Sequence, residues 1–198
     1  MEEGVIKYKQ NWQKEKLDID FNFKEIIEYR QKCFQNNWIG FDENLQVGFG
    51  NISQKFEGNQ FIISGSQTGH LPILRTNDFS LVNQFNIAKN ELTCVGLAKA
   101  SSESLTHSGI YQLSNKINVV LHIHNNKMWQ QHINKLPTSN ENVPYGTPAM
   151  AYEFQKLFNE GTINEVGILI MGGHQDGIIS WANSFKAAFE ILQGYERK

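Results

Sequence analysis

An apolar run that ends in two histidines constrains the fold of this chain more than any other feature. Residues 117–124 read Ile-Asn-Val-Val-Leu-His-Ile-His, and a short run rich in β-branched residues is typical of a strand. Side chains alternate between the faces of a strand, so His122 and His124 share one face, with Cα atoms ~6.6 Å apart at ~3.3 Å per residue. On a helix the same side chains would point about 200° apart. Val120 shares the histidine face of this strand, and the other face carries Val119, Leu121 and Ile123.

Two neighbouring imidazoles can supply part of a metal site. Zinc favours imidazole ligands, and a catalytic zinc site has three protein ligands and one open position. The sequence offers four candidates for the third ligand: His174, His132, His107 and His70. We favour His174 because it lies in a glycine-rich turn after an apolar strand, where a side chain is readily directed into a pocket. We expect His132 to face solvent. In the alternative interpretation, the histidine pair is purely structural.

Composition limits the classes of function. The 18 basic and 20 acidic side chains give a net charge of -2, which excludes a strongly basic nucleic-acid-binding protein. The 40% of hydrophobic residues argues against disorder. The longest apolar runs, 117–123 and 166–171, are far shorter than the ~20 residues of a membrane span, and the N-terminus shows no targeting signal. Two cysteines, Cys33 and Cys94, fit a reducing compartment. We therefore expect a cytoplasmic protein with one domain over residues 1–198.

Helical and strand patterns alternate along the whole chain, which predicts a mixed α/β fold. Thr147 and Gly161 have the residue types of an N-cap and a C′ position at the ends of one helix, and Gly194 is expected to end the last helix. The predicted helices are 23–38, 103–114, 148–160 and 184–193. The predicted strands are 60–64, 79–85, 91–96, 117–124, 165–171 and 177–181, with 79–96 forming a hairpin and 134–147 a loop.

The Ser101-Ser102-Glu103 segment opens a predicted helix. Hydroxyl groups and free backbone N–H groups at a helix start can bind an anion, and Glu103 would stand beside that site as a general acid or base. In the alternative interpretation, Ser102 is an ordinary N-cap and Glu103 interacts with the helix dipole. His107 follows one turn later, and we expect it to be a buried, hydrogen-bonded histidine.

Two glycine-rich turns can also bind phosphate through backbone N–H groups. They cover residues 48–53 (Gly-Phe-Gly-Asn-Ile-Ser) and 64–69 (Ser-Gly-Ser-Gln-Thr-Gly). Neither matches the Walker loop, which needs Gly-Lys-Ser/Thr. Each turn taken alone also fits an ordinary connection between strands.

The motifs occur in a fixed order that resembles the class II aldolase/adducin family. They are Gly50-Asn51-Ile52-Ser53, Ile62-Ile63-Ser64-Gly65, Ser101-Ser102-Glu103, His122-Ile123-His124 and Gly173-His174, and the resemblance spans roughly residues 23–193. It implies a three-layer α/β/α fold with a central, mostly antiparallel sheet. It also implies a homotetramer with active sites near subunit interfaces.

The resemblance implies a zinc-dependent lyase that acts on a small sugar phosphate or hydroxy-ketone through a metal-stabilised enediolate. Manganese or cobalt could replace zinc. His122, His124 and His174 would be the metal ligands, and Glu103 would be the acid/base. The residues implied to bind the substrate phosphate are Gly50, Asn51, Ser64, Gly65, Ser101 and Ser102.

The sequence also departs from the family pattern. Asn125-Asn126 replaces a Ser/Thr-Pro-like pair, the motifs contain no arginine, and Tyr145 is not assigned the role of the tyrosine that protonates product in the aldolases. The glutamate of the Ser-Ser-Glu segment favours aldolase or dehydratase chemistry over epimerisation. The alternatives are a sugar-phosphate dehydratase or epimerase with the same site, or a non-catalytic adducin-like binding module.

Overall fold

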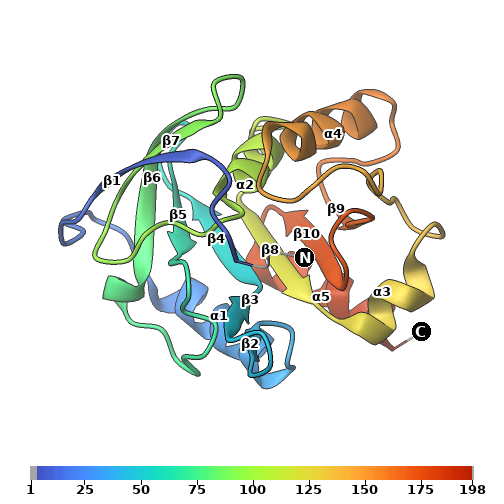
Figure 1. Cartoon of the computed structure of the whole chain (residues 1–198), viewed down its shortest axis with the longest axis horizontal. Coiled ribbons are helices and arrows are strands. Elements are labelled where there is room, and N and C mark those ends of the chain that lie inside the picture. Colours follow the sequence, from blue (N-terminus) through green and yellow to red (C-terminus); the bar gives the residue numbers. More distant parts are fainter. Residues whose placement is uncertain (1–3, 198) are drawn as a thin grey trace.

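A twisted sheet of eight strands forms the centre of the computed structural model, which describes residues 4–197 (Figure 1). The strand order is β1-β7-β6-β5-β4-β8-β10-β9, and only the β1–β7 pair is parallel. The strands are β1 (Lys9–Gln13), β4 (Asn51–Lys55), β5 (Phe61–Ser64), β6 (Phe79–Asn86), β7 (Glu91–Val95), β8 (Val119–His124), β9 (Gly167–Ile170) and β10 (Gly177–Ala182). The predicted mostly antiparallel sheet is confirmed, as is the 79–96 hairpin.

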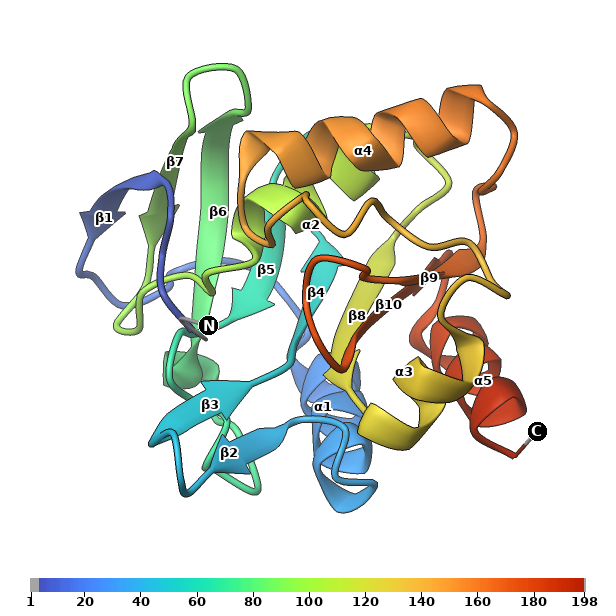
Figure 2. The ribbon, with the colours of Figure 1, turned by 45° about the vertical axis from the view of Figure 1, so that its right-hand side comes forward.

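Helices cover both faces of this sheet (Figures 1 and 2). They are α1 (Lys24–Gln35), α2 (Ser104–Tyr111), α3 (Asn126–His132), α4 (Pro148–Asn159) and α5 (Phe185–Glu196), with a short 3-10 helix at Thr76–Asp78. One apolar cluster includes side chains of α2 and α4, and a second includes side chains of α1, α3 and α5. The three-layer α/β/α arrangement is therefore confirmed. None of the helices within residues 4–197 is long and apolar enough to cross a membrane.

Strand β8 lies between β4 and β10, and its side chains alternate as predicted. Val120 belongs to the cluster under α2 and α4, whereas Leu121 and Ile123 belong to the opposite cluster. His122 follows Val120 on the same face, and its backbone pairs with Asn51 of β4. The histidine pair thus lies at the carboxyl end of a central strand, where it emerges from the core.

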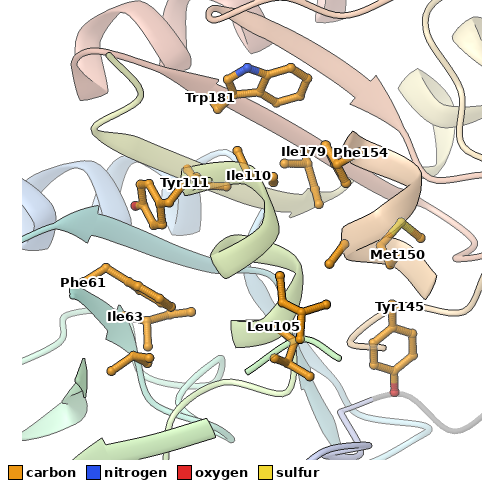
Figure 3. Packing of buried hydrophobic residues seen from close by; sticks show 14 of the residues in the cluster. Phe61, Ile63, Leu105, Ile110, Tyr111, Tyr145, Met150, Phe154, Ile179 and Trp181 are labelled. Atoms are coloured by element: carbon orange, nitrogen blue, oxygen red, sulfur yellow. The ribbon is translucent and has the colours of Figure 1, made fainter. Parts of the chain in front are cut away.

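The core between α2, α4 and the sheet is closely packed (Figure 3). Leu105, Ile110 and Phe154 are fully buried, as is Trp181 on β10. Full burial of such a side chain contributes about 1.5–3 kcal/mol. Gly109 lets α2 approach α4, because a Cβ there would lie 2.7 Å from the Cβ of Ala151. This packing fixes α2, which begins next to the candidate site.

Several local predictions are confirmed and one helix end is wrong. Thr147 caps α4 by accepting a hydrogen bond from the Met150 N–H, and Gly161 follows that helix with φ of +73°. Helix α5 continues through Gly194 to Glu196, so glycine does not end it. Apart from the chain neighbours and the backbone of its own helix, no described atom lies within 4 Å of a Cβ built at Gly194. A single glycine in an otherwise good helix costs only about 0.5–1 kcal/mol relative to alanine, which tertiary packing offsets.

Several short elements were not predicted. They include β1, β4, α3 and the hairpin of β2 (Gly40–Asp42) and β3 (Val47–Phe49). Asn125, which departs from the family pattern, is the N-cap of α3 and accepts a hydrogen bond from the Met128 N–H at 3.0 Å. Cys33 and Cys94 are free and buried, as expected for small apolar side chains.

Candidate metal centre

Three histidine rings converge at one point of the structure. His122 and His124 come from β8, and His174 comes from the turn between β9 and β10. The His124 Nε2 atom lies 3.2 Å from Nε2 of His122 and 3.0 Å from Nε2 of His174. One ligand atom from each ring lies within 4.8 Å of the others. Tetrahedral zinc with Zn–N bonds of 2.0–2.1 Å separates its nitrogen ligands by roughly 3.3 Å, which is close to the two separations of His124 from its neighbours.

A tight turn brings His174 to the strand pair. Gly177 of β10 pairs with His124, and its N–H donates to the His174 carbonyl at 3.0 Å. A Cβ at Gly177 would lie 2.5 Å from Cδ2 of His174, so the ring can occupy its place only beside glycine. Asp176 adopts the left-handed conformation with φ of +67°, which reverses the chain. The glycine-rich turn therefore allows the His174 ring to lie beside the strand pair.

Burial keeps the three rings uncharged at neutral pH. It lowers the pKa of His122 well below 6.5, and the neighbouring histidines lower it further. Burial also lowers the pKa of His124 to about 4 and that of His174 well below its usual value. A metal-binding imidazole must be neutral, so these rings are ready to coordinate a cation without losing protons.

The carboxylate of Glu103 lies beside the three rings. Its Oε1 atom is 4.0 Å from Nε2 of His122 and 3.9 Å from Nε2 of His174, and the residue is buried. Glu103 itself occupies the N-cap position of α2 and caps none of its backbone N–H groups. The alternative interpretation with Ser102 as N-cap is therefore wrong. The Glu103 side chain is directed to the histidines and away from the helix terminus.

A polar cavity adjoins the metal centre and contains most of the predicted anion-binding residues. Of these, Gly50, Asn51, Gly65, Ser101 and Ser102 line it, together with Glu103 and His122. Its lining also includes Gly4, Gly48, Ser66, Gln67, Thr68 and Gly69. The two glycine-rich turns and the Ser-Ser-Glu segment thus meet at one place.

Two of the predicted anion-binding side chains differ in whether they line the cavity. Ser64 does not line the cavity, because its hydroxyl accepts a hydrogen bond from the Ile52 N–H at 3.1 Å between β5 and β4. Asn51 does line it, and its buried Oδ1 atom has no hydrogen-bond partner within residues 4–197. The Asn51 carboxamide can therefore bind a ligand.

The remaining candidate histidines lie elsewhere. The Nδ1 atom of His107 shares a 2.7 Å hydrogen bond with the Ser53 hydroxyl, and burial lowers the His107 pKa to about 3. His107 is therefore buried and hydrogen-bonded, as predicted. His132 is buried and bonds the Tyr195 carbonyl, so its predicted exposure to solvent is wrong. It occupies an inward position of α3, a helix that was not predicted. His70 is exposed.

Two residues near the metal centre had no assigned role. The Tyr145 ring lies 4.4 Å from the His174 ring, centre to centre, and the Lys7 ammonium lies 3.3 Å from the centre of the Tyr145 ring. The charge of Lys7 contributes to the lowered pKa of His174. Lys7 precedes every motif, and no local pattern indicates that its segment packs there.

The sequence and the fold both have known relatives. The profile of the family described as Class II Aldolase and Adducin N-terminal domain matches residues 25–197. A search of curated proteins found no match. An L-fuculose-1-phosphate aldolase from Thermus thermophilus has a TM-score of 0.63 at 14% identity, over 88% of this chain and 89% of that one.

Two further solved structures share the fold. An L-fuculose 1-phosphate aldolase has a TM-score of 0.65 at 20% identity, over 88% of this chain and 81% of its own. A sugar-phosphate aldolase from Thermotoga maritima has a TM-score of 0.63 at 12% identity, over 87% and 89%. Because the family profile spans most of the sequence, the chain belongs to the class II aldolase and adducin N-terminal domain family.

Proposed function

We propose that this protein is a metal-dependent lyase of the class II aldolase type that acts on a small sugar phosphate or a related hydroxy-ketone. One observation carries the proposal: the Glu103 carboxylate lies within 4.0 Å of two ring nitrogens of a three-histidine cluster. A scaffold or binding module needs neither the cluster nor a buried carboxylate next to it.

His122, His124 and His174 would hold the metal ion, and their neutral rings suit zinc as well as manganese or cobalt. When bound, a divalent ion supplies Lewis acidity toward substrate oxygen atoms. Glu103 would move a proton at a carbon or oxygen atom of the substrate, which is the role of a general acid/base. Its burial keeps solvent from competing for that proton.

The polar cavity would hold the anionic end of the substrate. The backbone N–H group of Gly50, the Asn51 carboxamide and the hydroxyls of Ser101 and Ser102 are the proposed contacts. Gly65 also lines the cavity, but its N–H donates to the Asp78 carbonyl at 2.8 Å. The cavity has a volume of about 20 Å³, and a water molecule needs roughly 10–15 Å³ by the same measure. A phosphoryl group therefore requires the rim, including Gly4, to move outward.

The names of the solved relatives support the substrate class, since three of them are called sugar-phosphate or fuculose-phosphate aldolases. Cytoplasmic location and assembly into a homotetramer belong to the same proposal and rest on the family resemblance. A dehydratase or an epimerase could use the same side chains, so the product distinguishes these reactions.

The test is zinc content combined with retro-aldol and dehydration assays over a panel of sugar phosphates and their unphosphorylated forms. We expect about one zinc ion per chain and turnover of at least one phosphorylated substrate, with the products analysed by mass and stereochemistry. A protein that takes up no zinc, manganese or cobalt would contradict the proposal and favour a binding module. Full zinc content without turnover of any substrate would also contradict it.

A further inference from the structure

A buried arginine lies behind the cavity that we propose for the anion. Arg30 occupies an inward position of α1, between the buried residues Ile26 and Cys33, and is 1% exposed. Burial lowers its pKa to about 10, so the guanidinium remains charged at neutral pH. A buried charge is costly unless it is paired, so its partners need an explanation.

The partners of Arg30 are backbone carbonyls of one loop. Its Nη2 atom donates to the carbonyls of Thr68 and Gly69 at 3.0 and 3.1 Å, and Nη1 donates to that of Pro72 at 3.4 Å. Among the ion pairs of residues 4–197, none includes Arg30. The guanidinium is therefore hydrogen-bonded to neutral carbonyls, and the negative charge of Asp78 acts on it without a direct ion pair.

The loop whose carbonyls bind Arg30 also lines the cavity. Gln67, Thr68 and Gly69 are part of the cavity lining, whereas Arg30 is not. Because a trans peptide directs its C=O and N–H in opposite directions, the carbonyl of Thr68 bound to Arg30 directs the Gly69 N–H away from Arg30. Within residues 4–197, the N–H groups of these three residues donate to no protein acceptor.

The backbone geometry of the loop suits an anion. Gln67 has a left-handed φ of +64°, and a left-handed residue within a turn lets successive N–H groups point into one concavity. Gly69 packs against the Gly40 carbonyl so closely that a Cβ would lie 2.0 Å from that oxygen. The loop is therefore fixed between Arg30 and the β2 strand, with its donors unused.

We propose that Arg30 is a positioning residue for anion recognition: it holds the Thr68–Gly69 peptide groups with their N–H groups toward the cavity and supplies the positive charge behind them. A dianionic phosphoryl group in the cavity then completes the charge balance of the buried guanidinium. This inference rests on the anion-binding part of the proposed function. It explains how motifs without arginine can select a phosphorylated ligand.

The test measures binding of inorganic phosphate to the zinc-loaded, full-length protein by calorimetry. Arg30→Gln removes the charge and keeps hydrogen-bond donors, whereas Arg30→Lys keeps the charge. Arg75→Gln is the matched control, because Arg75 is exposed and its loss changes the net charge equally. We expect Arg30→Gln to weaken phosphate binding at least ~10-fold, Arg75→Gln to change it less than ~2-fold, and Arg30→Lys to restore part of the affinity.

Equal phosphate affinity of Arg30→Gln and Arg75→Gln would overturn the inference and leave the proposed lyase reaction intact. An equal loss in Arg30→Lys and Arg30→Gln would also overturn it, since loop support alone would then explain the effect. Absence of phosphate binding to the wild type would overturn it directly. Conversely, Arg30-dependent phosphate binding without turnover of any panel substrate would contradict only the lyase reaction.

A measurement on the wild type covers the case in which Arg30→Gln does not fold. In an NMR titration with inorganic phosphate, the amide signals of Gln67, Thr68 and Gly69 and the guanidinium signals of Arg30 should shift with one common affinity. Shifts that leave the loop amides or Arg30 unchanged would overturn the inference. With a known substrate, Arg30→Lys should raise KM and leave kcat within about twofold.

Discussion

The Nε2 atoms of His124 and His174 lie 3.0 Å apart, although one residue ends a strand and the other belongs to a turn fifty positions later. Both rings are neutral at physiological pH, because burial lowers the pKa of each. Two neutral nitrogens at this distance can share a single hydrogen, or both can direct lone pairs to a cation. The Nε2 atom of His122 lies 3.2 Å from that of His124, and a third nitrogen at this distance favours coordination of a cation over a shared hydrogen.

Removal of one ring should abolish tight metal binding. We expect His122→Ala to lose most of its bound zinc after dialysis, because two imidazoles hold a divalent ion much more weakly than three. Metal analysis of the purified variants checks this. The control His70→Ala removes an exposed histidine and should keep the full zinc content. Equal zinc content in both variants would contradict the assignment of His122.

Neutralising the carboxylate should separate metal binding from catalysis. We expect Glu103→Gln to retain zinc and to lower kcat by ~10²–10⁴, the usual contribution of a general acid/base. The comparison requires a substrate from the panel and metal analysis of the same preparation. Wild-type turnover in Glu103→Gln would show that Glu103 does not transfer the proton. Loss of zinc would instead indicate that the carboxylate supports the metal site.

Gly177 should be required for the placement of His174. A Cβ there would lie 2.5 Å from Cδ2 of the imidazole, so Gly177→Ala should displace the ring and weaken zinc binding at least ~10-fold. The matched control is Gly194→Ala, which meets nothing within 4 Å inside α5. This control should keep zinc and raise the free energy of unfolding by about 0.5–1 kcal/mol. Unchanged zinc affinity in Gly177→Ala would show that the turn is more adaptable than this geometry indicates.

The stability of the metal-free protein should depend on pH through its buried histidines. The folded-state pKa values of His107 and His124 are about 3 and about 4, whereas unfolded histidine titrates near 6.5. Between these values the unfolded state binds more protons, so the free energy of unfolding should fall as the pH drops below about 6.5. Each histidine contributes up to ~1.4 kcal/mol per pH unit.

Urea unfolding at several pH values checks this dependence. His107→Gln should reduce the slope below pH ~6.5, because it removes one titrating group that is not among the candidate metal ligands. The same slope in the variant and the wild type would contradict the assigned pKa of His107. The Gly194→Ala variant, which changes no titratable group, serves as the control and should retain the wild-type slope.

Local patterns predicted the main elements and the shared face of His122 and His124, whereas the full set of candidate ligands also depended on the resemblance to the family. The alternation in residues 119–124 is a period-two signal, and it correctly placed Val120 and Leu121 on opposite faces. His174 was one of four candidates for the third ligand. Only the pairing of β8 with β10 shows that its ring meets those of His122 and His124.

Features that depend on distant contacts could not be read from local patterns. Ser64 shares a motif with Gly65, yet pairing of β5 with β4 directs its hydroxyl to the Ile52 backbone. Arg30 looks like an ordinary charged residue on an amphipathic helix, and its burial follows from a loop that begins almost forty residues later. Lys7 reaches Tyr145 by a similar long-range contact. No local sequence pattern indicates that such residues contact each other.

We propose that His122, His124 and His174 bind one metal ion beside Glu103, and zinc X-ray absorption spectroscopy identifies the ligands of that ion. For the zinc-loaded protein we expect one zinc per chain with three imidazole nitrogens at about 2.0–2.1 Å and no sulfur ligand. His122→Ala should lose this spectrum. A site with sulfur at about 2.3 Å, with fewer than three imidazoles, or unchanged in His122→Ala would contradict the claim.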